Sequence, residues 1–183
     1  MATTLPLTSI RTDGGTQSRV KIDPEAVADY AAAYKERAAM PPLTVYHDGK
    51  AYWLADGFHR FQAAEKAGLL TVRCDVKRGT KKDAAWHSVG ANRQHGLRRT
   101  NADKQKAVRM ALTLHPERSN RVLAAHVGVS HEYIAKLRPQ VSTVDTCFRK
   151  GQDGKTYRIP SPKVGSPGKA PVKPLEPQPP PEP

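Results

Sequence analysis

The sequence predicts an α+β fold, followed by a helical unit and a proline-rich tail. Strand-like and helix-like patterns alternate up to residue 90, and helical patterns fill residues 91–140. The segment after Ile159 holds 10 of the 16 prolines of the 183-residue chain. Such a segment cannot bury enough apolar surface to fold, so we expect residues 160–183 to be disordered or in polyproline II. Residues 141–159 form a short extension whose polar run GQDGKTY suggests a small turn.

The domain predicted over residues 1–90 begins with a short strand and a helix with a clear start. Asp23 supplies an N-cap, Pro24 takes the first helical position, and Glu25 lies beside the positive end of the helix dipole. We expect this helix to end at Met40-Pro41-Pro42. The strand is expected to begin over residues 8–10. The helix has one apolar stripe, formed by Val27, Tyr30, Ala31 and Tyr34.

Two further strands, a helix and a last strand complete this predicted domain. Asp48-Gly49 between β-forming runs favours a hairpin. The elements predicted after the first helix are strands over 43–46 and 51–54, a helix over 58–67 that Gly68 closes, and a strand over 71–76. Cys74 in the last strand is expected to be a buried core thiol.

Residues 120–139, NRVLAAHVGVSHEYIAKLRP, have the pattern of a helix-turn-helix. Gly128 supplies a turn residue that tolerates positive φ, and Ala124 is small where the two helices come closest. Ser130 is suited to cap the second helix. The positions that such a pair buries are all apolar: Leu123, Val127, Val129, Ile134 and Leu137. An ordinary helical hairpin also needs a glycine and an apolar seam, so the residues alone leave that alternative open.

The helical unit over residues 91–140 is strongly basic. Thr100 and Asp103 resemble a capping box that opens a helix through Leu114, before Pro116. The chain holds 30 Lys and Arg against 17 Asp and Glu, a net charge of +13. Residues 1–89 contribute +3, whereas residues 90–140 contribute +7. A basic block around a helix-turn-helix is typical of proteins that bind the DNA backbone, although a soluble basic surface has the same composition.

The second helix of this motif supplies the candidate DNA-binding residues. We expect His131 and Glu132 to lie near base edges, and Lys136 and Arg138 to contact phosphates. Arg98, Arg99 and Lys104 would add phosphate contacts from the preceding helix and loop. The candidate DNA-binding set is Ser130, His131, Glu132, Tyr133, Lys136, Arg138 and Lys104.

Cysteine content and hydropathy exclude several classes of protein. Cys74 and Cys147 are too few and too far apart for a disulfide framework or a CxxC metal site. The N-terminus lacks the basic and apolar regions of a signal peptide, and no apolar run approaches the roughly 20 residues of a membrane span. We expect a cytoplasmic protein with no metal site formed by cysteines and no membrane partner.

A second candidate site lies where the strand over 51–54 turns into the helix over 58–67. A helix N-terminus presents free N–H groups and about half a positive charge, which suits a phosphate. Gly57 would let a ligand approach the backbone, and His59 and Arg60 would add donors and charge. Alternatively, Arg60 pairs with a neighbour and His59 packs in the interior, while Asp56 caps the helix.

The loop before residue 100 forms the second half of this candidate site. Asn92, His95, Arg98 and Arg99 bring amide, imidazole and guanidinium groups together there. The same cluster could contact DNA phosphates instead. Either role needs Arg98 and Arg99 to be accessible to solvent.

Three motifs in this order resemble the ParB/sulfiredoxin superfamily over roughly residues 5–160: DGFHRFQAAEKAG, then ANRQHGLRRTNADKQKAV, then the helix-turn-helix. The similarity is greatest to ParB-like proteins of plasmids, phages and other mobile elements. It implies a mixed sheet, a nucleotide site that takes CTP or ATP with Mg²⁺, and CTP-dependent DNA binding in chromosome or plasmid segregation. The nucleotide-binding residues that it implies are Asp56, Gly57, Phe58, His59, Arg60, Asn92, His95, Arg98 and Arg99.

The chain departs from the family pattern at several places, and His59 and His95 each stand where ParB proteins have an arginine. Sulfiredoxins have a reactive cysteine at the position of Phe58, which excludes reductase chemistry. Ala91 stands where the second nucleotide motif of ParB proteins has an acidic residue that helps to hold the metal, so we expect nucleotide binding without efficient hydrolysis. The proline-rich tail stands where ParB proteins have a folded dimerisation domain, so we expect a closed protein clamp to lack its usual lock.

Two classes of function follow from these patterns. The first is a sequence-specific DNA-binding protein of partition or regulation, nucleotide-responsive and homodimeric, at least on DNA. The second is a nucleotide hydrolase or nuclease. Metal-assisted phosphodiester cleavage usually needs several carboxylates or histidines, and Asp56 is the single carboxylate within the predicted pocket. A small-molecule kinase would need a base beside the phosphates, and none is evident. We therefore favour the DNA-binding class.

Overall fold

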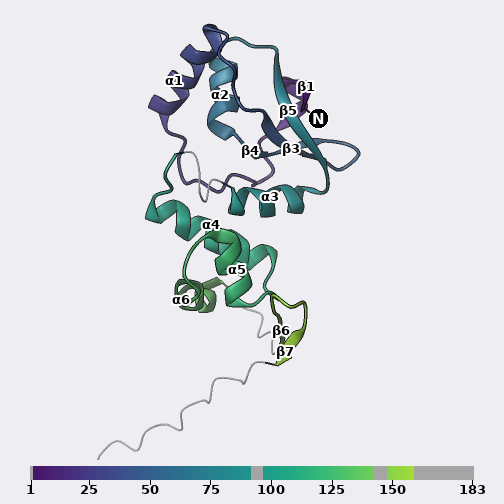
Figure 1. The fold of residues 1–183 in the computed structure, drawn as a ribbon, viewed down its shortest axis with the longest axis vertical. Coiled ribbons are helices and arrows are strands. Elements are labelled where there is room, and N and C mark those ends of the chain that lie inside the picture. Colours follow the sequence, from purple (N-terminus) through teal and green to yellow (C-terminus); the bar gives the residue numbers. More distant parts are fainter. Residues whose placement is uncertain (1, 92–96, 142–147, 159–183) are drawn as a thin grey trace, which may run out of the picture.

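The computed structural model describes residues 2–91, 97–141 and 148–158, which form an α+β protein (Figure 1). The sheet and three helices occupy one end, and three further helices with a small hairpin occupy the other. The helices are α1 (Pro24–Lys35), α2 (Phe58–Lys66), α3 (Lys81–Gly90), α4 (Asn101–Leu114), α5 (Asn120–Val127) and α6 (His131–Val141). The strands are β1 (Ala2–Pro6), β2 (Ile10–Arg11), β3 (Leu43–His47), β4 (Tyr52–Asp56), β5 (Thr71–Arg78), β6 (Phe148–Lys150) and β7 (Thr156–Arg158).

The main sheet is mixed, as expected, with the strand order β1-β5-β3-β4-β2. The pairs β1–β5 and β3–β4 are antiparallel, whereas β3–β5 and β2–β4 are parallel. The predicted β3–β4 hairpin is present, and Gly49 in its turn has a φ of 97°. The sheet therefore brings the C-terminal end of β4 to the start of α2.

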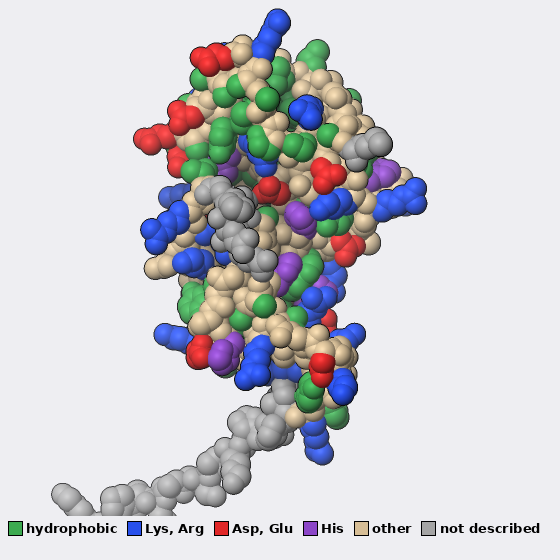
Figure 2. All heavy atoms as spheres, in the orientation of Figure 1, with side chains coloured by type: hydrophobic (Ala, Val, Ile, Leu, Met, Phe, Trp, Pro, Cys, Tyr) green, Lys and Arg blue, Asp and Glu red, His purple; other side chains and the backbone are tan. Residues whose placement is uncertain are grey.

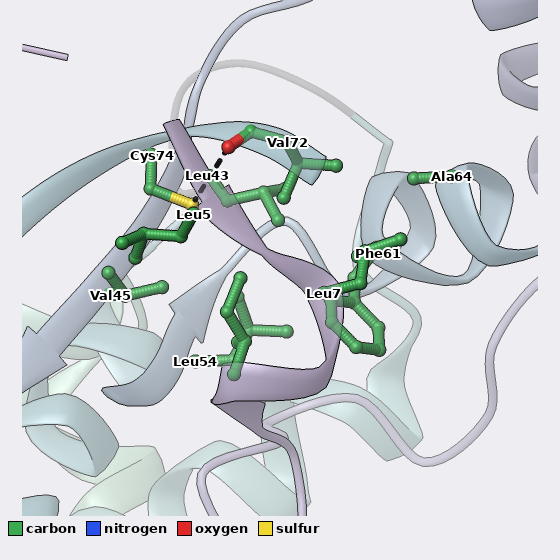
Figure 3. Close-up of a cluster of buried hydrophobic side chains, with 10 residues drawn as sticks. Leu5, Leu7, Leu43, Val45, Leu54, Phe61, Ala64, Val72 and Cys74 are labelled. Atoms are coloured by element: carbon green, nitrogen blue, oxygen red, sulfur yellow. Dashed lines mark hydrogen bonds between the residues drawn. The ribbon is translucent and has the colours of Figure 1, made fainter. Parts of the chain in front are cut away.

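The main core lies between this sheet and α2 (Figure 3). Phe61 and Ala64 of α2 pack with side chains from all five strands of the sheet, and α1 packs on α2 through Val27 and Ala31. Cys74 is fully buried there, as predicted, and burial raises the pKa of its thiol to about 11.

Local capping signals account for the predicted helix starts. Asp23 accepts the N–H groups of Glu25 (3.0 Å) and Ala26 (3.5 Å) at the start of α1. Thr100 and Asp103 form a complete capping box at the start of α4, with Asp103 N–H to Thr100 Oγ1 at 3.1 Å. These hydrogen bonds satisfy N–H groups that have no partner within the helix.

In the first domain, the predicted end of one helix and the predicted start of one strand are wrong, and two elements were missed. α1 ends at Lys35, before the Met40-Pro41-Pro42 stop, and Arg37 beyond it has a φ of 57°. Residues 7–9 form a short 3-10 helix in place of a strand. β1 and α3 were not predicted, although Thr80 and Asp83 form a capping box that marks the start of α3.

Helices α4, α5 and α6 share a second core with α3. Val89 of α3 packs among the buried apolar side chains of these helices, which include Leu112, Leu123 and Ile134. α5 and α6 are joined by a tight turn in which Gly128 has a φ of 75°. Ser130 Oγ accepts the N–H of Tyr133 at 3.2 Å, as expected of a cap. None of the described helices is long and apolar enough to cross a membrane.

Candidate functional site

A cavity of about 440 Å³ lies where β4 turns into α2. Its walls come from five separate segments of the first 90 residues and from Leu97 before α4. The lining side chains include Gln17, Ser18, Arg19, Tyr30, Met40, Pro41, Asp56, Phe58, His59, Arg60, Ser88 and Leu97. The cavity therefore contains the predicted turn and several residues that the sequence did not identify.

Gly57 is the N-cap residue of α2 and has a φ of 99°. Among the described residues no side-chain cap hydrogen bond forms at this N-cap position, so the alternative in which Asp56 is the N-cap is wrong. A Cβ at Gly57 would lie 2.6 Å from Leu43 Cδ2 and 3.0 Å from Arg60 Nη2. Glycine is therefore required here by the left-handed backbone and by close packing within the protein.

Arg60 is held by the protein itself. Its Nη1 donates to the carbonyls of Pro41 (2.6 Å) and Pro42 (2.9 Å), and its Nη2 pairs with Asp56 Oδ2 at 3.1 Å. The side chain is 15% exposed. Arg60 therefore pairs with a neighbour, which was the alternative left open by the sequence. It still lines the cavity.

The sequence suggested that His59 adds positive charge to the cavity. In the structure it does not. The residue is 8% exposed, and its Nε2 accepts the N–H of Asp23 at 3.0 Å. Burial, and then the nearby Arg19 guanidinium, hold the pKa of His59 below its usual range. The ring is therefore neutral and fixes the start of α1 against α2.

Arg19 is a cationic wall of the cavity that the sequence did not reveal. Its Nη2 donates to the carbonyl of Leu97 at 2.5 Å, and its Nη1 lies 3.6 Å from Asp103 Oδ2. The peptide unit between Arg19 and Val20 is also hydrogen-bonded to α4. Val20 N–H donates to Asp103 Oδ1 (2.8 Å), and Lys106 Nζ donates to the carbonyl of Arg19 (2.7 Å).

Asp103 is the centre of this junction between the cavity wall and α4. Its side chain is 6% exposed. Burial alone would raise the pKa of its carboxyl, but hydrogen bonds from the Val20 and Thr100 N–H groups and the Arg19 charge lower it overall. The ionised carboxylate thus caps α4 and holds the segment that lines the cavity.

The second half of the predicted nucleotide site is not assembled around this cavity by the described residues. Asn92 and His95 lie outside the described residues. Arg98 is exposed, whereas Arg99 is partly buried. Arg99 donates to the carbonyls of Val89 (3.3 Å) and Val127 (2.5 Å), so its guanidinium joins the ends of α3 and α5.

Helix α6 exposes one polar face on the opposite end of the molecule. His131, Glu132 and Lys136 are exposed, and His131 Nε2 lies 3.2 Å from Glu132 Oε1. Ser130 is exposed as well, whereas Tyr133 packs partly on the helical core and Lys104 is partly buried in the first turn of α4.

The prediction that Arg138 faces DNA is wrong. The residue is 5% exposed. It donates to Asn120 Oδ1 (2.8 Å) and to the carbonyls of Pro116 (2.8 Å) and Arg118 (2.7 Å). Burial, and then the nearby Arg149 charge, lower its pKa to about 10. The spacing already indicated this, because Arg138 lies four residues after the buried Ile134.

Metal-ligating side chains are sparse in the part of the chain that the structure describes. No group of three or more His, Cys, Asp or Glu residues there is placed to hold a metal ion. Asp56 is the carboxylate among the described residues that line the cavity, and it is paired with Arg60.

Comparisons with known proteins connect the N-terminal half of the chain to one family. The sequence profile of the ParB N-terminal domain matches residues 2–93. Chromosome-partitioning protein Spo0J of Thermus thermophilus is 36% identical over 90 residues, which are 49% of this chain and 33% of that protein. The chloroplastic/mitochondrial sulfiredoxin of Arabidopsis thaliana is 29% identical over 92 residues, 48% of this chain and 68% of that protein.

A solved structure extends the likeness in fold into the helical region. It is the C-terminally truncated chromosome-partitioning protein ParB from Caulobacter crescentus, complexed to the centromeric parS site. It matches with a TM-score of 0.51 and 19% identity, over 78% of this chain and 73% of that one. The chain spans about a third of the length of Spo0J. Because the matched region covers half of the chain and includes β1 to α3, this protein belongs to the ParB N-terminal domain family.

Proposed function

We propose that this protein binds DNA sequence-specifically in the partition or regulation of a chromosome or mobile element, with α5 and α6 as its helix-turn-helix. The observation that carries the proposal is the exposed face of α6. Ile134 and Leu137 bury the inner side of the helix, while His131 and Lys136 remain exposed. The first residues of a recognition helix contact base edges, which assigns His131 and Glu132 to bases and Lys136 to a phosphate.

The positive charge of the helical region and its similarity in fold to a known DNA-binding protein support this proposal. Residues 90–140 carry a net charge of +7, and Lys and Arg side chains predominate over Asp and Glu on the face of α4–α6 drawn in Figure 2. Arg98 and Lys104 supply further phosphate contacts. The Caulobacter crescentus ParB of similar fold was solved on its parS site. We expect a cytoplasmic protein that binds paired half-sites as a homodimer, at least on DNA.

A selection from random duplex DNA tests this proposal. The wild-type protein should enrich one sequence motif, and His131→Ala should relax the preference at one or two base pairs. Lys136→Ala should weaken binding to all sequences, because a phosphate contact carries no base information. Lys66→Ala, an exposed lysine of α2, is the matched control and should bind like the wild type. Enrichment of no motif by the wild type would refute sequence-specific binding.

We also propose a nucleotide as the ligand of the cavity. Its volume of about 440 Å³ suits a small-molecule ligand. The first turn of α2 offers N–H groups that no side chain caps, and Arg19 and Arg60 bring two guanidinium groups to the wall. A phosphate at this turn would share Arg60 with Asp56. The family resemblance favours CTP.

Ligand binding at this cavity would reach the helical region through Arg19. The segment that lines the cavity is tied to Leu97 and to Asp103, which belongs to the capping box of α4. Ser18 Oγ also donates to the Ser88 carbonyl at the end of α3, at 3.1 Å. A nucleotide that moves Arg19 would therefore change how α4 is attached, which supports a role as a regulator of DNA binding.

Binding and turnover of nucleotides separate this regulator from an enzyme. Labelled CTP, ATP and GTP should be titrated with and without Mg²⁺, beside a measurement of phosphate release. A single carboxylate paired with an arginine is a poor magnesium site, so we expect binding without efficient hydrolysis. Turnover that does not depend on DNA would favour the hydrolase. Binding of none of the three would refute the nucleotide proposal and leave the DNA-binding proposal standing.

A further inference from the structure

The β6–β7 hairpin, residues 148–158, is fixed to the chain just before α5 (Figure 1). Lys150 N–H donates to the carbonyl of Glu117 (2.8 Å), and the carbonyl of Lys150 accepts the N–H of Ser119 (3.0 Å). Ser119 is also the N-cap of α5. These backbone hydrogen bonds hold the hairpin beside the N-terminal end of α5.

The hairpin is basic and exposed. Its 11 residues include Arg149, Lys150, Lys155 and Arg158, against Asp153 as the single acidic residue. None of the ion pairs formed among the described residues involves these four cationic side chains. Lys155 and Arg158 are exposed, so their charges are available to an anionic partner.

A cavity of about 550 Å³ lies between the hairpin and the N-terminal ends of α5 and α6. Asn120 and Arg121 line it from α5, His131 lines it from α6, and Arg149 and Tyr157 line it from the hairpin. Because His131 begins α6, the hairpin and the proposed recognition helix border the same hollow.

Arg149 gives this hollow the character of an anion site. Its Nε is buried and has no hydrogen-bond partner among the described residues. By contrast, the buried Arg138 guanidinium already donates to three protein oxygens. A buried guanidinium nitrogen without an acceptor is costly, so the Arg149 side chain would gain by turning toward an anionic oxygen in the hollow that it lines.

We infer that the β6–β7 hairpin is a second DNA-contacting element, which binds backbone phosphates of the duplex beside the groove that α6 enters. Arg149 makes the inner phosphate contact, and Lys155 and Arg158 make the outer ones. The inference rests on the proposed function, since the shared hollow places the hairpin on the DNA side of α6. It assigns a role to the segment that the sequence left without one.

Asp153 limits the strength of this contact. It lines the same cavity, and its carboxylate accepts the Tyr157 hydroxyl and the Lys155 N–H. Its negative charge opposes a phosphate in the hollow. Replacing it with asparagine keeps an oxygen for the turn and removes the repulsion, so Asp153→Asn should bind DNA about two- to fivefold more tightly at low salt.

The salt dependence of DNA affinity tests the inference. Each phosphate contact contributes about 0.9 to the slope of log K against log salt concentration. Lys155→Gln with Arg158→Gln should therefore lower the magnitude of the slope by about 1.8, and Arg149→Gln by about 0.9. Lys35→Gln with Lys66→Gln removes two exposed lysines at the far end of the molecule and should leave the slope unchanged.

The outcomes separate this inference from the proposed function. Wild-type protein that does not bind duplex DNA would overturn both. Binding that weakens in Lys136→Ala, with an unchanged slope in the exposed Lys155→Gln, Arg158→Gln variant, would overturn the hairpin's role alone. Base preferences should be the same in the hairpin variants as in the wild type, because phosphate contacts position the protein without reading sequence.

Discussion

Two regions of this molecule carry arginines and lysines, and they differ in what those side chains contact. At the turn from β4 into α2, Arg60 donates to two backbone carbonyls and pairs with Asp56. At the opposite end, Lys136, Lys155 and Arg158 are exposed. A ligand at the first region must compete with protein acceptors, whereas the proposed DNA partner of the second would meet exposed charges.

Burial within the second region divides its cations into two further groups. Arg138 stabilises the junction of α5 and α6, while Lys136, two residues earlier, lies on the exposed face of the same helix. Structural and DNA-binding roles should therefore separate sharply between neighbouring positions. Substitutions at buried and exposed positions test this separation.

Arg138→Ala should lower the free energy of unfolding by about 3 kcal/mol or more, because it removes a buried side chain and leaves three partly buried oxygens without this donor. Lys136→Ala should change it by less than about 0.5 kcal/mol, since that side chain is exposed. Chemical denaturation followed by circular dichroism measures both values. Equal losses in the two variants would contradict the structural assignment of Arg138.

Gly57→Ala should cost about 2–3 kcal/mol of stability, because the left-handed backbone and the contact with Leu43 both oppose a Cβ. Gly49→Ala is the matched control. Its φ is 97°, but nothing lies within 4 Å of an added Cβ, so the loss should be that of backbone strain, about 1 kcal/mol. Denaturation midpoints that are equal for the two variants would show that close packing at Gly57 is unimportant.

Asp103→Asn should lower stability at neutral pH by about 1–2 kcal/mol, since the carboxylate holds both the α4 cap and Arg19. The folded-state pKa of Asp103 lies below its unfolded value, so this contribution is complete above about pH 4 and is lost as the pH falls through the folded pKa. The difference from wild type should therefore shrink in acid.

Asp29→Asn, which removes an exposed carboxylate of α1, is the control for the change in charge. Unfolding curves recorded between about pH 7 and pH 2.5 cover the range of Asp103. A stability difference for Asp103→Asn that is the same at every pH would show that the ionised carboxylate does not hold the junction.

The parts of the fold that local chemistry determines were predictable from the sequence. The caps at Asp23 and Thr100, the Asp48-Gly49 turn and the Gly128 turn each depend on residues within one turn of the chain. Helix α3 was missed because it buries Ala84 and Ala85 as well as Val89, between the sheet and the other helices, so no single apolar stripe marks it.

The cavity depended on contacts that no local pattern encodes. Thr16 is fully buried and donates to the carbonyl of Leu54, 38 residues later in the chain, which places Gln17 to Arg19 along the wall. The turn at Gly57 was found because its sequence motif is local, but the partners of Arg60 come from the loop of Pro41 and Pro42. Long-range hydrogen bonds thus decided which arginines are available.

The most direct test of the central claim is a titration of the protein with its selected DNA duplex, followed by amide chemical shifts. We expect chemical-shift changes at residues 119–121, at 130–136 and in the β6–β7 hairpin, and none in α1 and α2. Shifts confined to α1 and α2, or none with the duplex in excess, would contradict the assignment of the α6 face and the hairpin to DNA.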